Sequence, residues 1–224
     1  MGQEVALSET TKTYWDHPGL KLGIDRTALI VVDMQNAFLH PDGSITIKRK
    51  FDISGLQVAI EPCRVLVKAA RAKGIPIIFT QYVYRADYSD GGVRLREMTP
   101  QVVGSGALVA GSWDADFFDG LSPEAGDLVI QKNRPSSFYS TPLESNLRSM
   151  RIESLVICGV TTNICVETTA RDASQRDYRT FVVADATGEM EQDRHDVALK
   201  TLGRFFARVL DVADVLAAWK VSGD

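Results

Sequence analysis

Three side chains of different chemical type follow three apolar segments of this sequence. Asp33 comes directly after ALIVV, Lys132 comes directly after DLVIQ, and Cys165 lies seven residues beyond the end of SLVIC. Together a carboxylate, an amine and a thiol can carry out nucleophilic catalysis. The carboxylate accepts the thiol proton, the sulfur attacks a carbonyl carbon, and the ammonium group stabilises negative charge.

Cys165 is the candidate nucleophile. A free thiol has a pKa of about 8.5, and a helix N-terminus or a neighbouring ammonium such as that of Lys132 lowers it. We expect a helix to begin at residue 162, which would have this effect. Backbone N–H groups of Thr161 and Cys165 could then hold an oxyanion. The alternative, equally weighted on position alone, is that Cys165 is a small buried helix residue.

Asp33, Lys132 and the other two cysteines each have a structural alternative. Asp33 could make a turn contact, and Lys132 could be a lysine whose amine reaches solvent from a strand end. Their position at neighbouring strand ends favours a shared catalytic role, with Asp33 as general base. Cys158 lies inside an apolar segment and Cys63 inside an amphipathic one, so we expect both to be packing residues.

Apolar runs alternate with amphipathic segments along the chain. We expect strands at 27–32, 75–80, 127–131, 154–158, 180–184 and 207–210. We expect helices at 57–73, 114–121, 142–150, 162–176, 193–202 and 213–219. This alternation predicts the α/β class: a three-layer α-β-α sandwich with a doubly wound, mostly parallel six-stranded sheet. We interpret residues 1–25 as an N-terminal arm and residues 26–224 as a single domain.

The expected sheet explains how distant residues could form one site. In open α/β sheets, ligands bind beyond the carboxyl ends of the strands. Asp33, Lys132 and Cys165 all follow such ends. Residues 81–112 have no clear period, and a connection of that length is often functional.

Composition excludes several classes of protein. The formal net charge of -4, with both signs interspersed, does not suggest nucleic-acid binding. No apolar stretch approaches the roughly 20 residues of a membrane span. The three cysteines and the polar N-terminus favour a cytoplasmic protein. His17, His40 and His195 follow no strand end, and no metal, dinucleotide or P-loop motif is present, so we expect no metal and no cofactor.

Three segments resemble the isochorismatase-like cysteine hydrolases: ALIVVDMQNAF at 28–38, LVIQKNRPSSFYSTPLESNLRS around Lys132, and LVICGVTTNICVETTARDA at 155–173. The resemblance implies a catalytic triad of Asp33, Lys132 and Cys165, a cis peptide between Val160 and Thr161, and a homo-oligomer. It also implies hydrolysis of a small-molecule amide or ureide. The thiol distinguishes the chain from true isochorismatases. The segment TQYVYRADYSDGG lacks the histidines of the nicotinamidase metal site.

Apart from those two groups, the sequence is similar to the ureidoacrylate, biuret, N-carbamoylsarcosine and maleamate amidohydrolases. The segment GSWDADFFDGL at 111–121 is nearest to the ureidoacrylate type. A non-catalytic binding member and a redox-sensing thiol protein are the alternatives. Arg134 or Arg85 could pair with a carboxylate of the substrate, although Lys and Arg side chains in loops are more often simply solvated. Further substrate contacts are expected from aromatic and polar side chains near the strand ends: Phe38, Trp113, Phe138, Tyr139, Gln35, Asn36, Gln81 and Asn163.

Overall fold

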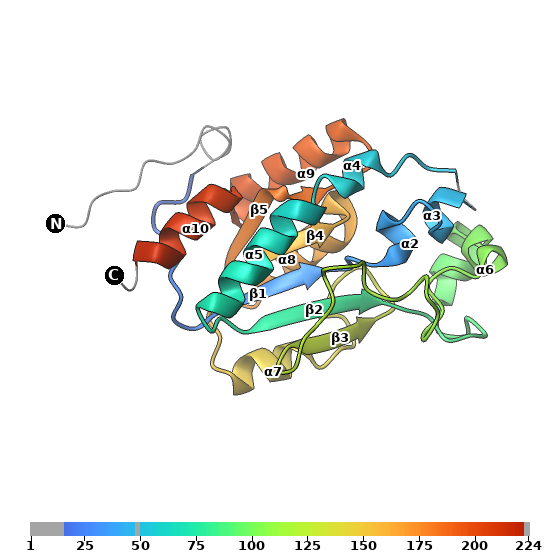
Figure 1. Ribbon diagram of the computed structural model, residues 1–224, viewed down its shortest axis with the longest axis horizontal. Helices are drawn as coiled ribbons and strands as arrows, with labels where there is room; N and C mark the ends of the chain where they lie inside the picture. The colour runs from blue at the N-terminus through green and yellow to red at the C-terminus, as the bar shows by residue number, and fades with distance from the viewer. Residues whose placement is uncertain (1–15, 48–49, 222–224) are drawn as a thin grey trace.

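The computed structural model describes residues 16–47 and 50–221. Six parallel strands form one sheet in the order β3-β2-β1-β4-β5-β6 (Figure 1). The strands are β1 (Thr27–Val32), β2 (Ile77–Tyr82), β3 (Leu128–Lys132), β4 (Ser154–Val160), β5 (Arg179–Gly188) and β6 (Arg208–Leu210). The strand order reverses between β1 and β4. The predicted doubly wound α/β sheet is thereby confirmed.

Each central strand is apolar on both faces because helices cover both faces. On β1, Ala28, Ile30 and Val32 belong to one core cluster, whereas Leu29 and Val31 belong to the other. The first face is covered by α7 (Leu143–Ser149), α8 (Glu167–Ser174) and α9 (Gln192–Phe205). The second is covered by α4 (Ser54–Gln57), α5 (Ile60–Ala72) and α10 (Val212–Val221).

The predicted helix at 114–121 is wrong. Residues of this segment form hydrogen bonds with distant parts of the chain rather than within a local helix. The Asp114 carboxylate accepts from the N–H and hydroxyl of Ser44 and from the N–H of Leu108. Phe117 forms an isolated antiparallel bridge with Gln35. Tertiary contacts have therefore overridden the helical pattern.

Other boundaries differ more modestly from the expected ones. The helix expected at 57–73 corresponds to α5, which begins three residues later; α4 precedes it and shares only Gln57 with the expected range. The helix expected at 162–176 is divided into a π-helix, η2 (Thr162–Val166), and α8. Strand β2 begins two residues later than expected, at Ile77. Residues 81–112 contain a second π-helix, η1 (Arg94–Met98), and α6 (Gln101–Ser105). Two single-turn helices follow β1: α2 (Asn36–Leu39) and α3 (Ser44–Ile47).

Part of the predicted N-terminal arm, residues 1–15, lies outside the described residues. Residues 16–25 lie against β6 and α9. The Arg208 guanidinium donates to the Asp16 carboxylate at 2.9 Å and to the Leu20 carbonyl at 3.1 Å, and His17 donates to the Gly203 carbonyl at 2.8 Å. Across the described residues, no helix is both long and apolar enough to cross a membrane.

Gly159 lets β4 approach β1 closely just before the segment that carries Cys165. Its φ is +112°, and a Cβ at this position would lie 2.2 Å from the Val32 carbonyl oxygen. Val32 is its partner in the parallel ladder. Both the backbone conformation and the contact therefore require glycine.

We predict that Gly159→Ala lowers the free energy of unfolding by about 2–4 kcal/mol, because it combines an unfavourable φ with overpacking against backbone. Chemical denaturation monitored by circular dichroism measures this. Gly126→Ala is the matched control, since its φ is +100° but nothing lies within 4 Å of the added Cβ. Equal losses in the two variants would show that the contact with Val32 is unimportant.

Candidate active site

A buried ion pair joins the ends of β1 and β3. The Lys132 ammonium donates to Asp33 Oδ2 at 2.7 Å, and the two side chains are 0% and 1% exposed. The Lys132 ammonium also donates to the Pro135 carbonyl at 3.0 Å and, at 3.3 Å, to that of Arg134. The chain turning away from β3 thus surrounds the amine with oxygen acceptors.

Strand β2 lies between β1 and β3 and supplies the contacts that connect the pair. The Thr80 hydroxyl donates to Asp33 Oδ1 at 2.6 Å and accepts from the Asp33 N–H at 3.1 Å. The Lys132 ammonium lies 4.5 Å from the centre of the Tyr82 ring. Asp33 itself has a φ of +50°, a region that aspartate adopts more readily than most residues. The sequence analysis did not identify Thr80 or Tyr82.

Cys165 lies beside this pair, in the π-helix η2. Its thiol interacts with both the Asp33 carboxylate and the Lys132 ammonium. Burial raises the pKa of Cys165 to about 12; the Lys132 charge lowers the pKa and the Asp33 charge raises it. Burial is thus the largest effect on this pKa and outweighs the lowering by Lys132, so the net shift is upward and not downward as expected.

The pKa of Lys132 shifts in the direction that keeps the amine charged. Burial alone lowers the pKa, but Asp33 and Cys165 outweigh burial and raise it above its ordinary value. The site therefore keeps a buried ammonium group charged.

The backbone of the segment between β4 and Cys165 has an unusual geometry. The peptide bond between Val160 and Thr161 is cis. The Thr161 carbonyl accepts from the N–H groups of Ile164 and Val166. The Thr161 N–H has no hydrogen-bond partner within the part of the chain that the structure describes.

Two residues that the sequence analysis did not propose for this site form hydrogen bonds with η2. The Glu189 carboxylate, which follows β5, accepts from the Asn163 N–H at 3.2 Å and from the Met190 N–H at 3.0 Å. His195 on α9 lies 2.9 Å from the Thr162 hydroxyl. His195 was expected in a late helix and not at a strand end; it lies on α9, which packs against η2. No sequence signal distinguishes Glu189 or His195 from other polar residues.

Two of the predicted substrate contacts hold the framework together instead. Gln35 is fully buried: its amide nitrogen donates to the carbonyls of Tyr82 and Ala115, and its amide oxygen accepts from the Tyr82 N–H. The Gln81 amide also donates to the Ala115 carbonyl, at 2.9 Å. Gln35 has little capacity left for a ligand. These two glutamines secure residues 113–118 to the ends of β1 and β2.

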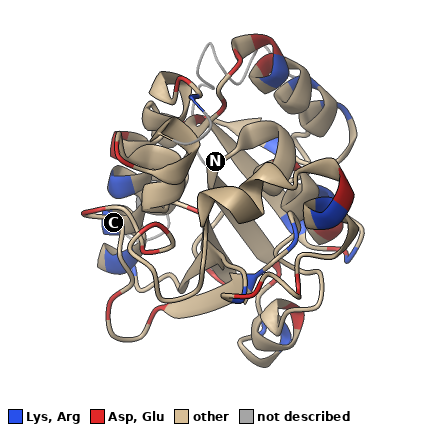
Figure 2. Ribbon diagram, turned by 90° about the vertical axis from the view of Figure 1, so that its right-hand side faces the viewer, with Lys and Arg blue, Asp and Glu red and all other residues tan. Residues whose placement is uncertain are grey.

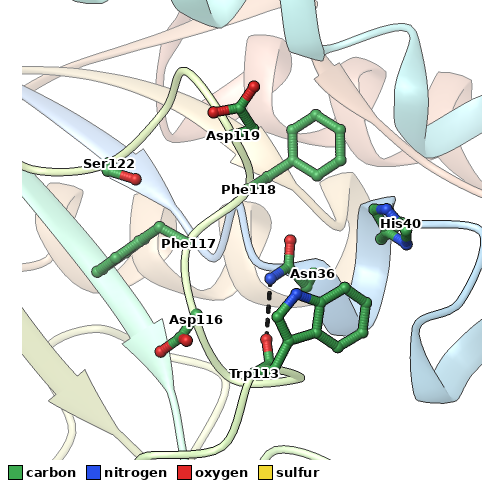
Figure 3. Close-up of a pocket in the computed structure, with 8 residues that line it drawn as sticks. All are labelled: Asn36, His40, Trp113, Asp116, Phe117, Phe118, Asp119 and Ser122. Atoms are coloured by element: carbon green, nitrogen blue, oxygen red, sulfur yellow. Dashed lines mark hydrogen bonds between the residues drawn. The ribbon is translucent and has the colours of Figure 1, made fainter.

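Asn36 and Trp113 line a cavity of about 730 Å³ (Figure 3). The Asn36 amide donates to the Trp113 carbonyl at 2.9 Å. The other lining residues are His40, Asp116, Phe117, Phe118, Asp119 and Ser122. The cavity does not include Asp33, Lys132 or Cys165 in its lining. Its Phe117 and Phe118 pack with the core cluster beneath α5, whereas Cys165 belongs to the opposite cluster.

The other predicted contacts are divided between core and surface. Phe138 is buried in the same cluster as Cys165, Phe38 is half-buried between the two clusters, and Tyr139 is 58% exposed. The Arg134 guanidinium donates to the carbonyls of Asp90 and Asn133. Arg85 is largely exposed and pairs with Asp87. Their pairing with a substrate carboxylate stays a prediction.

Figure 2 turns the carboxyl ends of the strands toward the viewer, and Lys and Arg positions are interspersed with Asp and Glu positions along the ribbon. Within residues 16–47 and 50–221, no three His, Cys, Asp or Glu side chains are grouped in a way that could hold a metal ion. Cys63 and Cys158 are fully buried in the cluster beneath α5, as expected of packing residues.

Comparison with known proteins identifies relatives that match most of the chain. The family described as "Isochorismatase domain" matches residues 27–214. The ureidoacrylate amidohydrolase RutB of Methylobacterium radiotolerans is 39% identical over 200 residues, covering 84% of this chain and 77% of that protein. The RutB protein of Serratia proteamaculans is 39% identical over 199 residues, covering 83% and 79%.

Solved structures agree with this match. A cysteine hydrolase from Pseudomonas syringae pv. phaseolicola superposes with a TM-score of 0.79 at 28% identity, covering 97% of this chain and 98% of that one. N-carbamoylsarcosine amidase from Thermoplasma acidophilum gives a TM-score of 0.66 at 28% identity, covering 83% and 96%. The family match, the two relatives and the shared fold lead to one conclusion: the chain belongs to the isochorismatase-like hydrolases.

Proposed function

We propose that this protein is a cysteine amidohydrolase that cleaves a C–N bond of a small ureido substrate of the ureidoacrylate type, through a thioester-like intermediate on Cys165. The observation that carries the proposal is the meeting of the Cys165 thiol with the buried Asp33–Lys132 ion pair. The names of the relatives, ureidoacrylate amidohydrolase and N-carbamoylsarcosine amidase, support a ureido group as the bond that is cut.

The broader enzyme class does not depend on which nucleophile, intermediate or substrate is proposed. Family membership makes the protein a hydrolase that acts on carbon–nitrogen bonds other than peptide bonds. The proposal adds the nucleophile, the intermediate and the substrate type.

In the first half-reaction, Asp33 acts as the general base. Because the pKa of Cys165 is about 12, the thiol does not ionise by itself near neutral pH. Asp33 removes its proton as the sulfur attacks the carbamoyl carbon, so charge is created only as the new bond forms. The oxyanion is placed against the N–H groups of Thr161 and Cys165.

Collapse of this intermediate breaks the C–N bond, and Asp33 returns the proton to the departing nitrogen, which leaves as ammonia or an amine. In the second half-reaction, water gives a proton to Asp33 and attacks the carbonyl carbon bound to sulfur. The C–S bond then breaks and the proton returns to the thiol. Lys132 stays charged throughout and stabilises the negative charge that moves between Asp33, Cys165 and the intermediate.

Cys165→Ala is expected to abolish ammonia release from ureidoacrylate, biuret, N-carbamoylsarcosine and maleamate, because no other group can form the covalent intermediate. An ammonia assay over this panel measures the loss, and intact-protein mass spectrometry of rapidly quenched wild type detects the adduct. The matched control is Cys63→Ala, which removes a buried thiol on the other side of the sheet. Retained turnover in Cys165→Ala would exclude the covalent mechanism.

The alkylation of Cys165 by iodoacetamide should depend on pH as a thiol of raised pKa does. Below a pKa of about 12 the thiolate fraction grows tenfold per pH unit, so the labelling rate should rise from pH 7 to 10 without a plateau. Asp33→Asn removes a charge that raises the pKa, so it should label faster at a given pH while losing turnover. A plateau near pH 8.5 in wild type would contradict the raised pKa.

Substitutions of Asp33 and Lys132 should have strongly coupled effects on the free energy of unfolding. Asp33→Asn and Lys132→Met each leave one buried charge unpaired, and each should cost about 3–5 kcal/mol of unfolding free energy. The double variant should recover much of that loss, because neither charge remains, yet it should stay inactive. Urea denaturation of the four proteins completes the cycle. Additive losses would show that the two groups do not interact.

A further inference from the structure

We infer that Arg94 binds a carboxylate group of the substrate and so makes the enzyme selective for carboxylate-bearing ureides. The inference rests on the proposed function and assigns the far end of the substrate, away from the bond that is cut. Four features carry it: the anchoring of η1, its link to the exit of β3, the unpartnered guanidinium, and the electrostatic link through Tyr82.

The π-helix η1 is anchored in the same core cluster as the candidate nucleophile. Leu95, the residue after Arg94, is 3% exposed and belongs to the cluster that contains Tyr82, Phe138 and Cys165. A π-helix is uncommon and is often found at functional sites. The anchoring of Leu95 fixes the backbone at Arg94 relative to the site.

The segment before Arg94 is also bound to the chain that leaves β3. The Asn133 amide donates to the Asp90 carboxylate at 3.2 Å, and the Arg134 guanidinium donates to the Asp90 carbonyl at 3.0 Å. The Lys132 ammonium donates to the carbonyl of the same Arg134. Residues 133 and 134, which directly follow Lys132, therefore connect segment 90–95 with the Asp33–Lys132 ion pair.

Within the described part of the chain, the Arg94 guanidinium has neither an ion-pair partner nor a hydrogen-bond acceptor, and its Nε is buried. Leaving a buried donor of a charged group unpaired costs free energy that a ligand can recover. Guanidinium groups carry only donors, in a planar fork that matches a carboxylate. The nearby Arg134, in contrast, already donates to two backbone carbonyls.

Tyr82 connects Arg94 with the catalytic groups. The Tyr82 ring lies under the Lys132 ammonium, and its hydroxyl donates to the Asn133 carbonyl at 3.1 Å. Burial raises the pKa of Tyr82; the positive charge of Arg94 opposes this shift, and Cys165 adds to it. Arg94 and Cys165 thus both act on this one side chain. A short ureido acid could place its carbamoyl carbon at Cys165 and its carboxylate at Arg94.

The test compares 3-ureidoacrylate with its uncharged methyl ester, by ammonia release, in wild type, Arg94→Gln and Arg94→Lys. For the acid, Arg94→Gln should raise KM roughly 10- to 100-fold, because a charged hydrogen-bonded pair is lost, with kcat changed less than KM. For the ester, KM should stay within about threefold. Arg94→Lys should recover part of the affinity for the acid only.

Arg96→Gln is the matched control, since Arg96 lies on the same π-helix with an exposed side chain. It should behave as wild type with both substrates. Unchanged acid kinetics in Arg94→Gln would overturn the inference, as would an equal loss for acid and ester. Turnover of the ester by Arg94→Gln shows that the variant is folded.

Binding separates the inference from the proposed function. Calorimetric titration of Cys165→Ala, with and without Arg94→Gln, measures the affinity for acid and ester without turnover. Preferential loss of acid binding supports the role of Arg94 even if the wild type releases no ammonia, a result that would refute only the proposed function. An unchanged dissociation constant for the acid would refute the role of Arg94 whatever the turnover.

Discussion

The buried ion pair between Asp33 and Lys132 is the constraint on which the rest of the site depends. Two charges 2.7 Å apart with almost no exposure are stable only when their remaining hydrogen-bonding capacity is satisfied. Thr80 supplies a donor to Asp33, and the carbonyls of Arg134 and Pro135 accept from Lys132. This requires three adjacent strands to end together, which the β3-β2-β1 order of the sheet provides.

In the proposed mechanism, the same burial determines how the thiol reacts. An exposed cysteine could be activated by lowering its pKa, but burial raises the pKa of Cys165 to about 12. A neutral thiol beside a carboxylate favours proton transfer during attack over a preformed thiolate. It also leaves the resting enzyme with a single compensated ion pair rather than an additional buried negative charge.

Contacts outside Asp33, Lys132 and Cys165 keep η2 and the surrounding loops in place. Glu189 and His195 hold η2 from the side of β5 and α9, while Gln35 and Gln81 hold residues 113–118 against β1 and β2. The long connection after β2 carries Arg94, whose Nε is buried without a partner. In the proposed function, reaction chemistry and substrate selection come from different parts of the chain: strand ends provide the first and the 81–112 connection provides the second.

The sequence by itself determined the class of fold and the three candidate catalytic residues, because buried parallel strands are continuous apolar runs and their carboxyl ends meet at one edge. Only the tertiary structure decided the rest. Residues 114–121 have a helical pattern, but Asp114 and Phe117 bond to distant segments. Gln35 follows a strand end and Arg94 lies in the 81–112 connection, and the sequence shows both only as polar residues. In the structure, backbone groups use the hydrogen-bonding capacity of Gln35, whereas Arg94 Nε is left without a partner. These partners depend on contacts between residues far apart in the chain.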